Sequence, residues 1–184
     1  MERRPDFSNG LVHLTKETEK SHAFEILKKI LTEGKIKASG RSGFIKGGHE
    51  ATCLSEIPLA GLKNFSQPAD GDAPKTRYRP YGVLLSKKAI FNAGGRPVIY
   101  LPDNEAGWIP DEEKWRHVRF EHGKVDWTHE REWRVKGDID LSTLPGLYVL
   151  VWKAEEAKEI TNMKGDFQKK VRGILPLEHL NQFL

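Results

Sequence analysis

Apolar positions recur along this chain with two different periods. Between residues 17 and 33 they follow helical spacing, which predicts an amphipathic helix that Gly34 ends. The residues that carry this pattern are Phe24, Ile26, Leu27, Ile30 and Leu31. Elsewhere, short apolar or alternating segments predict strands. These segments are 11–15, 35–39, 51–57, 81–86, 97–101, 130–136, 147–152 and 171–175.

Strands therefore outnumber helices in this pattern. Shorter helical segments are expected at 87–93, 112–121, 154–163 and 177–184. With 184 residues the chain has the usual size of one domain. We expect an α+β fold in a single domain, 1–184, with a mixed β core, an N-terminal helix and few peripheral helices.

Composition narrows the class of protein. Hydrophobic residues make up 38% and charged residues 30%, a mixture typical of folded proteins and not of disordered chains. No apolar run approaches the roughly 20 residues that span a bilayer. The first ten residues lack the apolar stretch of a secretory signal, and Cys53 is the only cysteine. We therefore expect a cytoplasmic protein with no membrane partner, no disulfide and no metal site.

A long polar segment precedes the strand at 81–86. Residues 61–80 are rich in Gly, Pro, Asp and Asn, and they lead into the sequence KTRYRPY at 75–81. There Arg77 and Arg79 alternate with tyrosines, a pattern suited to phosphate contacts and base stacking on single-stranded nucleic acid. The alternative is a loop whose tyrosines pack on the core. The net charge of +4 is compatible with nucleic-acid binding but does not require it.

Two predicted strands carry polar residues on one face. In LVHLT, alternation places Val12 and Leu14 on one side and His13 and Thr15 on the other. His13 is either a ligand-binding group or a core histidine with a satisfied hydrogen bond. In ATCLSEI, Ser55 shares its side with Cys53, and the alternative to a binding role is an ordinary strand serine.

The segment DWTHEREWR, residues 126–134, gathers charge beside two tryptophans. Strand alternation would place Glu130, Glu132 and Arg134 on one face. Two neighbouring carboxylates repel each other, which raises the pKa of one of them. The alternative is structural, with Arg134 neutralising Glu132.

The order of these features resembles the ADP-ribosyltransferase superfamily over residues 11 to 135. His13 and Thr15 are similar to the H-x-[ST] motif of the diphtheria-toxin and poly-ADP-ribose polymerase branch, and Gly34 to its glycine after the helix. Glu132 is similar to the late catalytic glutamate, and Glu130 with it to the E-x-E motif of other branches. The layout also resembles the DNA-modifying toxin DarT. The segments LVHLT, CLSEIPL, YGVLLSK and EREWR resemble AbiGi-type and related phage-resistance families of bacteria.

The resemblance implies NAD+ as the substrate, with cleavage of its nicotinamide–ribose bond. Glu132 would stabilise the charge that develops on the ribose, and Glu130 would orient or deprotonate the acceptor. His13, with Thr15, would hold the adenosine ribose, and Ser55 would play the serine role of the arginine-dependent branch.

Two further NAD+ contacts follow from the same resemblance. Because Ser55 and its neighbours stand where the family has a tyrosine, Phe44 and Tyr81 are the candidates to stack on nicotinamide. Arg41 or Arg96 would meet the pyrophosphate.

The expected function is an ADP-ribosyltransferase acting as a toxin or phage-defence effector on nucleic acid, with an antitoxin as a further expected partner. One alternative is a non-enzymatic module that binds nucleic acid or a partner through KTRYRPY. The other is a metal-dependent nuclease that uses Asp126, Glu130 and Glu132. For the enzyme, we expect the strands at 11–15 and 130–136 to bring His13 and Glu132 into one cleft.

Overall fold

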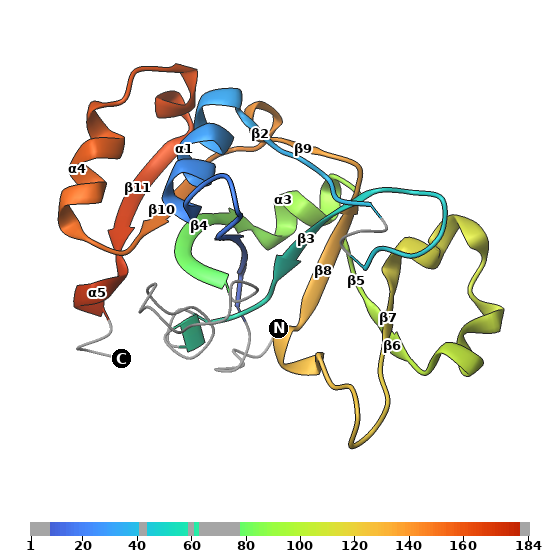
Figure 1. Cartoon of the computed structure of the whole chain (residues 1–184). Helices are drawn as coiled ribbons and strands as arrows, with labels where there is room; N and C mark the ends of the chain where they lie inside the picture. The colour runs from blue at the N-terminus through green and yellow to red at the C-terminus, as the bar shows by residue number, and fades with distance from the viewer. Residues whose placement is uncertain (1–7, 41–43, 59–60, 63–77, 181–184) are drawn as a thin grey trace.

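The computed structural model describes residues 8–40, 44–58, 61–62 and 78–180. A seven-stranded sheet forms its centre, in the order β11-β10-β4-β1-β3-β8-β5 (Figure 1). All neighbours in it are antiparallel except β10 and β11. Its strands are β1 (Gly10–Lys16), β3 (Ala51–Ser55), β4 (Tyr78–Ser86), β5 (Arg96–Pro97), β8 (Glu132–Lys136), β10 (Leu147–Val151) and β11 (Val171–Pro176).

Two small sheets, α-helices and several 3-10 turns accompany the central sheet in the described residues. The small sheets pair β2 (Lys35–Ile36) with β9 (Ile139–Asp140) and β6 (Ile99–Leu101) with β7 (His117–Arg119). The helices are α1 (Ala23–Glu33), α3 (Lys87–Asn92), α4 (Ala154–Asn162) and α5 (Leu177–Leu180). This mixed fold, with a mostly antiparallel sheet and few helices, confirms the α+β prediction.

The helix boundaries correct two expectations. Helix α1 ends at Gly34 as predicted, with this glycine at a φ of 64°, but it begins at Ala23 and not at residue 17. Lys16 still belongs to β1, and Thr18 and Ser21 then form a hydrogen-bonded turn. The helix expected over 112–121 is instead a 3-10 turn at Asp111–Arg116 followed by β7.

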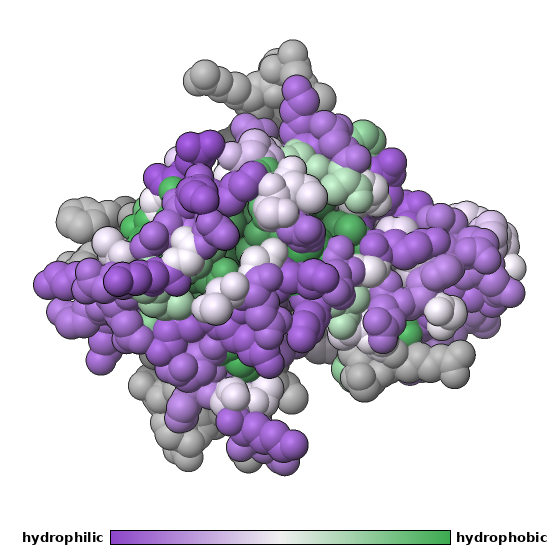
Figure 2. Space-filling view, turned by 90° about the horizontal axis from the view of Figure 1, so that it is seen from above, coloured by the Kyte–Doolittle hydropathy of each residue, from purple (hydrophilic) through white to green (hydrophobic). Residues whose placement is uncertain are grey.

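Both faces of the sheet are covered by apolar side chains. On one face, Leu27 and Leu31 of α1 pack with Leu11, Leu54 and other buried residues of the strands. A second, smaller cluster lies on the other face and contains Val12, Leu14, Ile57, Leu62, Leu150 and Leu177. Seen from above, the protein surface is largely hydrophilic, with hydrophobic residues gathered mainly near its middle (Figure 2). Among the described residues, no helix is both long and apolar enough to cross a bilayer.

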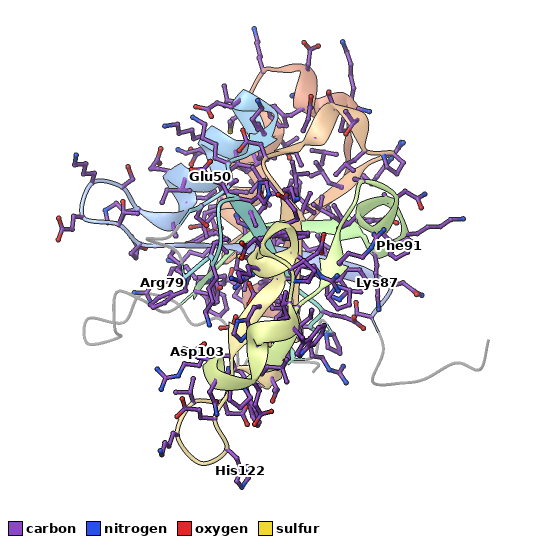
Figure 3. The ribbon with its side chains drawn as sticks, turned by 90° about the vertical axis from the view of Figure 1, so that its right-hand side faces the viewer. Glu50, Arg79, Lys87, Phe91, Asp103 and His122 are labelled. Atoms are coloured by element: carbon purple, nitrogen blue, oxygen red, sulfur yellow. The ribbon has the colours of Figure 1, made fainter. Side chains whose placement is uncertain are left out.

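Residues 99–119, here called the lobe, project from the end of the molecule away from α4 and β11 (Figure 1). The lobe contains β6, β7 and two 3-10 turns, at Asp103–Trp108 and Asp111–Arg116. Figure 3 shows Asp103 within this projection and His122 at the bottom of the view, on the loop that follows β7. Trp115 is the buried residue that ties the lobe to Ile45 and Ala51. The lobe therefore packs against β3 through Ala51, and the backbone oxygen of Trp115 accepts a hydrogen bond from Arg134 of the neighbouring strand β8.

Gly82 allows β1 and β4 to approach closely. A Cβ atom at this position would lie 2.1 Å from the backbone oxygen of His13. Since neither strand can move without breaking the central pairing, we expect Gly82→Ala to lower the free energy of unfolding by about 3 kcal/mol or more. Thermal or urea unfolding measures this. Gly107→Ala, which meets nothing within 4 Å, is the control; equal stability of the two variants would contradict the close approach.

Candidate active site

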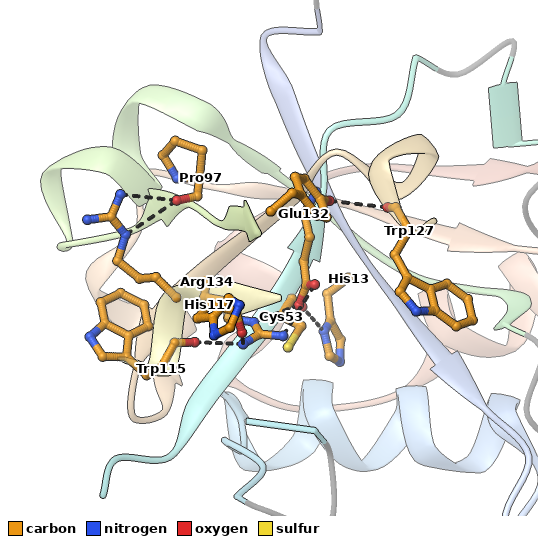
Figure 4. Close-up of polar contacts among 10 residues, drawn as sticks. His13, Cys53, Pro97, Trp115, His117, Trp127, Glu132 and Arg134 are labelled. Carbon is orange, nitrogen blue, oxygen red and sulfur yellow. Dashed lines mark hydrogen bonds and ion pairs between the residues drawn. The ribbon is translucent and has the colours of Figure 1, made fainter. Parts of the chain in front are cut away.

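Glu132 begins β8 and lies on the same face as Arg134. The pairing of β3 with β8 sets Ser55 opposite Glu132 and Cys53 opposite Arg134, so all four side chains share a face. Glu132 accepts hydrogen bonds from Arg134 at 2.8 Å from Nε and 3.4 Å from Nη2 (Figure 4). Both residues are buried. The ion pair foreseen as the structural alternative is therefore present, but it is enclosed and not solvated.

The lobe holds Arg134 from the side opposite Glu132. Arg134 Nη1 donates to the backbone oxygen of Trp115 at 2.6 Å and to that of His117 at 3.4 Å. The two backbone oxygens accept from Nη1, the nitrogen that does not contact Glu132, so the guanidinium is fixed on two sides. The Glu132 carboxylate is consequently held in one orientation.

Glu130 does not belong to β8, which corrects the predicted strand over 130–136. It ends a 3-10 turn, Thr128–Glu130, and Arg131 then reverses the chain with a φ of 44°. Burial, followed by the nearby charge of Glu132, raises the pKa of Glu130 to about 7, although Lys16 and Arg134 act in the opposite direction. The two carboxylates thus influence each other as the sequence indicated, by a turn and not by strand alternation.

Tyr100 of β6 links the two carboxylates through the backbone. Its hydroxyl accepts a hydrogen bond from the Glu132 amide at 3.0 Å and donates to the backbone oxygen of Trp127 at 3.2 Å. Burial raises the pKa of Tyr100 to about 12, so the phenol keeps its proton at neutral pH. The Tyr100 hydroxyl therefore connects Trp127, at the start of the turn that contains Glu130, with Glu132, the first residue of β8.

Tyr78 and Cys53 also lie near the two carboxylates. Like Tyr100, they were not predicted as site residues. Burial, with the charge of Glu130 next in size, raises the pKa of Tyr78, and burial with the charge of Glu132 raises the pKa of the Cys53 thiol. Both stay protonated at neutral pH. Tyr78 belongs to KTRYRPY, where the pattern indicated base stacking, and no sequence signal singled out Tyr100.

His13 does not share a face with Glu132. Val12 is paired with Ser55, and Ser55 with Glu132, so alternation turns His13 to the opposite face. Its Nδ1 lies 2.9 Å from the backbone oxygen of Cys53, which brings the ring beside β3 (Figure 4). The expectation that His13 and Glu132 line one cleft is therefore not supported by the register. The ring is half-buried and hydrogen-bonded within the fold, and a role of His13 in holding NAD+ stays a prediction.

The buried environment of His13 predicts a dependence of stability on pH. Burial lowers the pKa of His13 below 6.5, and the hydrogen bond to the backbone oxygen of Cys53 opposes this only in part. The unfolded chain then binds the proton first, so stability is complete above pH 6.5 and falls as the pH decreases below it, by at most about 1.4 kcal/mol per pH unit. His13→Gln should lose less stability between pH 7 and pH 5 in urea unfolding. An equal loss in both proteins would contradict this interpretation.

Thr15, Tyr81 and Ser55 are engaged within the fold. Thr15 Oγ1 lies 2.9 Å from the backbone oxygen of Ala23 and 3.1 Å from that of Tyr81. The Tyr81 ring packs on Phe24, and its hydroxyl donates to Glu156 at 2.7 Å. Tyr81 therefore lies on the α1 side of the sheet, away from Glu132. Ser55 is buried directly opposite Glu132.

Phe44 is the remaining stacking candidate. Its side chain is 87% exposed, and its backbone has a φ of 63°, which is rare for a residue other than glycine. None of its described contacts joins it to Glu130 or Glu132. Its role with nicotinamide stays a prediction.

The arginine candidates have different surroundings from those expected. Arg79, labelled in Figure 3, belongs to β4. Its side chain is 4% exposed and its Nε lies 3.8 Å from Glu17, so little of it is available to a nucleic acid at the surface. Arg96 stacks on the Phe91 ring at 4.2 Å and donates to the backbone oxygens of Phe91 and Gly95. Arg41 and Arg77 lie outside the described residues.

A metal-binding carboxylate triad is not formed in the part of the chain that the structure describes. No group of three or more His, Cys, Asp or Glu side chains there is close enough to hold a metal ion. Asp126 instead accepts hydrogen bonds from the amide and hydroxyl of Thr128, at 2.9 and 2.6 Å.

Comparisons with protein-family models, curated proteins and solved structures return no match for this chain.

Proposed function

We propose that this protein is an NAD+-cleaving ADP-ribosyltransferase with an ADP-ribosyltransferase-like fold, and that Glu130 and Glu132 carry its reaction. The observation that supports the proposal is the unequal pair of carboxylates at the start of β8. Arg134 fixes the carboxylate of Glu132, while the pKa of Glu130 is raised to about 7. Two acidic groups in different environments are typical of sites that separate charge stabilisation from proton transfer.

Glu132 would act on the bond between ribose and nicotinamide. As that bond breaks, its electron pair leaves with nicotinamide and positive charge develops on the ribose. A carboxylate held in advance stabilises this charge without reorganising, which is usually the largest contribution to such catalysis. The ion pair with Arg134 and the hydrogen bond that the Glu132 backbone amide donates to the Tyr100 hydroxyl provide this fixed position.

Glu130 would act as the general base for the acceptor. A group with a pKa near 7 is partly deprotonated at neutral pH and still basic enough to take a proton. As the acceptor oxygen or nitrogen bonds to the ribose carbon, its proton passes to the Glu130 carboxylate. Because His13 and Tyr81 lie toward the other face, they have no part in this proposal.

The acceptor that we propose is a single-stranded nucleic acid, in keeping with a toxin or phage-defence effector that has an antitoxin. The mild positive charge and the arginine–tyrosine sequence at 75–81, which runs into β4, favour this class. Since Arg79 is buried and paired with Glu17, contact with the acceptor would depend on other groups of that sequence.

The experiment supplies purified protein with NAD+ labelled in its adenylate half, together with single-stranded DNA, single-stranded RNA or a protein mixture. We expect label on nucleic acid, and the same rate in the presence of EDTA. Label on protein alone would contradict the proposed acceptor. Release of ADP-ribose without any labelled acceptor would identify water as the acceptor.

A further inference from the structure

Arg134 stands between the lobe and the carboxylate that the proposed reaction needs. Its side chain is 3% exposed and makes contacts in two directions. Toward the start of β8 it reaches both oxygens of Glu132, and toward the lobe it reaches the backbone oxygens of Trp115 and His117. A guanidinium is planar and carries its donors in a rigid fork, so these four contacts leave it little freedom.

The two backbone acceptors are themselves well fixed. Trp115 is buried against Ile45 and Ala51, and His117 is a buried residue of β7 whose ring lies 2.9 Å from the backbone oxygen of Leu101. The orientation of the Glu132 carboxylate is therefore set, through the side chain of Arg134, by two backbone oxygens of the lobe that lie 19 and 17 residues before Arg134 in the chain.

We propose that Arg134 is a positioning residue, which fixes the Glu132 carboxylate by joining it to the backbone oxygens of Trp115 and His117. This inference rests on the proposed function of Glu132. A lysine at this position would keep the positive charge but lose the fork, since it has one nitrogen on a flexible stem. Position and charge can therefore be tested separately.

The kinetic test compares Arg134→Lys and Arg134→Met with the wild-type chain in release of nicotinamide from NAD+. We expect Arg134→Lys to lower kcat about 10²-fold, the scale for a reacting group that is misplaced by about 1 Å, with little change in KM. Arg116→Lys is the matched control. Arg116 also belongs to the lobe, and it donates to a backbone oxygen and a carboxylate, those of Pro97 and Glu113, outside the carboxylate pair.

The dependence of kcat on pH separates the two variants further. The charges that face Glu130 are Glu132 and Arg134 of β8 and Lys16 of β1, with the neutral phenols of Tyr78 and Tyr100 nearby. Arg134→Met removes one positive charge, so the acidic limb of the profile should move to higher pH. Arg134→Lys should leave the limb in place and lower only its plateau. Wild-type kcat in Arg134→Lys would overturn the proposal, as would a loss no larger than that of the Arg116→Lys control.

A second measurement needs no substrate, so it stands if NAD+ is not cleaved. In protein labelled with ¹³C at glutamate carboxyls, Glu132 is assigned by its absence from Glu132→Gln. We expect a distinct Glu132 resonance in the wild type that moves toward the position of exposed glutamates in Arg134→Lys, with folding monitored by circular dichroism. An unchanged resonance would overturn the positioning role. A moved resonance with no NAD+ turnover by the wild type would instead contradict the proposed function alone.

Discussion

Glu132→Gln should lower the rate of nicotinamide release from NAD+ by about 10²-fold or more, the scale for losing one preorganised electrostatic group. The amide keeps the size of the side chain but removes the charge that would face the developing positive ribose. It also removes the negative charge that pairs with Arg134, so the buried ion pair is lost.

The control for this prediction is Glu155→Gln, an exposed residue in the first turn of α4. The initial rate is measured at saturating NAD+, and circular dichroism establishes that both variants are folded. A Glu132→Gln variant that keeps the wild-type rate would remove Glu132 from the reaction.

Glu130→Gln should strongly lower transfer to the acceptor while making the folded chain more stable at pH 8. The folded pKa of about 7 lies above the ordinary value of 4.5, so the folded state holds a proton that the unfolded state has lost. Stability from this group is complete below pH 4.5 and is lost as the pH rises through 7. The glutamine has no charge to bury at any pH.

The size of this stabilisation follows from the same difference. A pKa rise from 4.5 to about 7 corresponds to at most about 3 kcal/mol, and partial exposure of Glu130 reduces this to about 1–2 kcal/mol. Urea unfolding at pH 8 and pH 4 measures it, and we expect a gain at pH 8 alone. A variant that is less stable at both pH values would show that Glu130 has a structural role and not a basic one.

The acidic limb of the reaction provides the companion measurement. Wild-type transfer should increase as the pH rises through about 7, since the base must lose its proton first. In Glu130→Gln the remaining activity should lack this limb.

Features of the fold that depend on neighbouring residues were predictable from the sequence. Gly34 ends α1 because its φ of 64° suits a glycine, and the apolar spacing before it identifies the buried side of the helix. The closeness of Glu132 to Glu130 and to Arg134 is also local, and it accounts for the buried ion pair and for the smaller, electrostatic part of the pKa rise of Glu130. The larger cause of that rise is burial, which depends on the fold.

Features that depend on contacts between residues far apart in the sequence were not predictable in the same way. The pairing of Val12 with Ser55 decides that His13 and Glu132 face opposite sides, and a shift of one residue would reverse that. Tyr100 reaches Glu132 only because β6 of the lobe lies beside β8. The sequence indicated that Arg79 belongs to an exposed basic loop, but β4 begins at Tyr78, so Arg79 lies in this strand and its side chain is buried.

The most direct measurement of the central claim is release of nicotinamide from NAD+ by the purified chain, with single-stranded DNA and RNA present and EDTA added. We predict many turnovers per molecule of wild-type protein, and at most about one hundredth of that rate in Glu132→Gln. Release no faster than the spontaneous breakdown of NAD+, from a chain shown to be folded, would contradict the account.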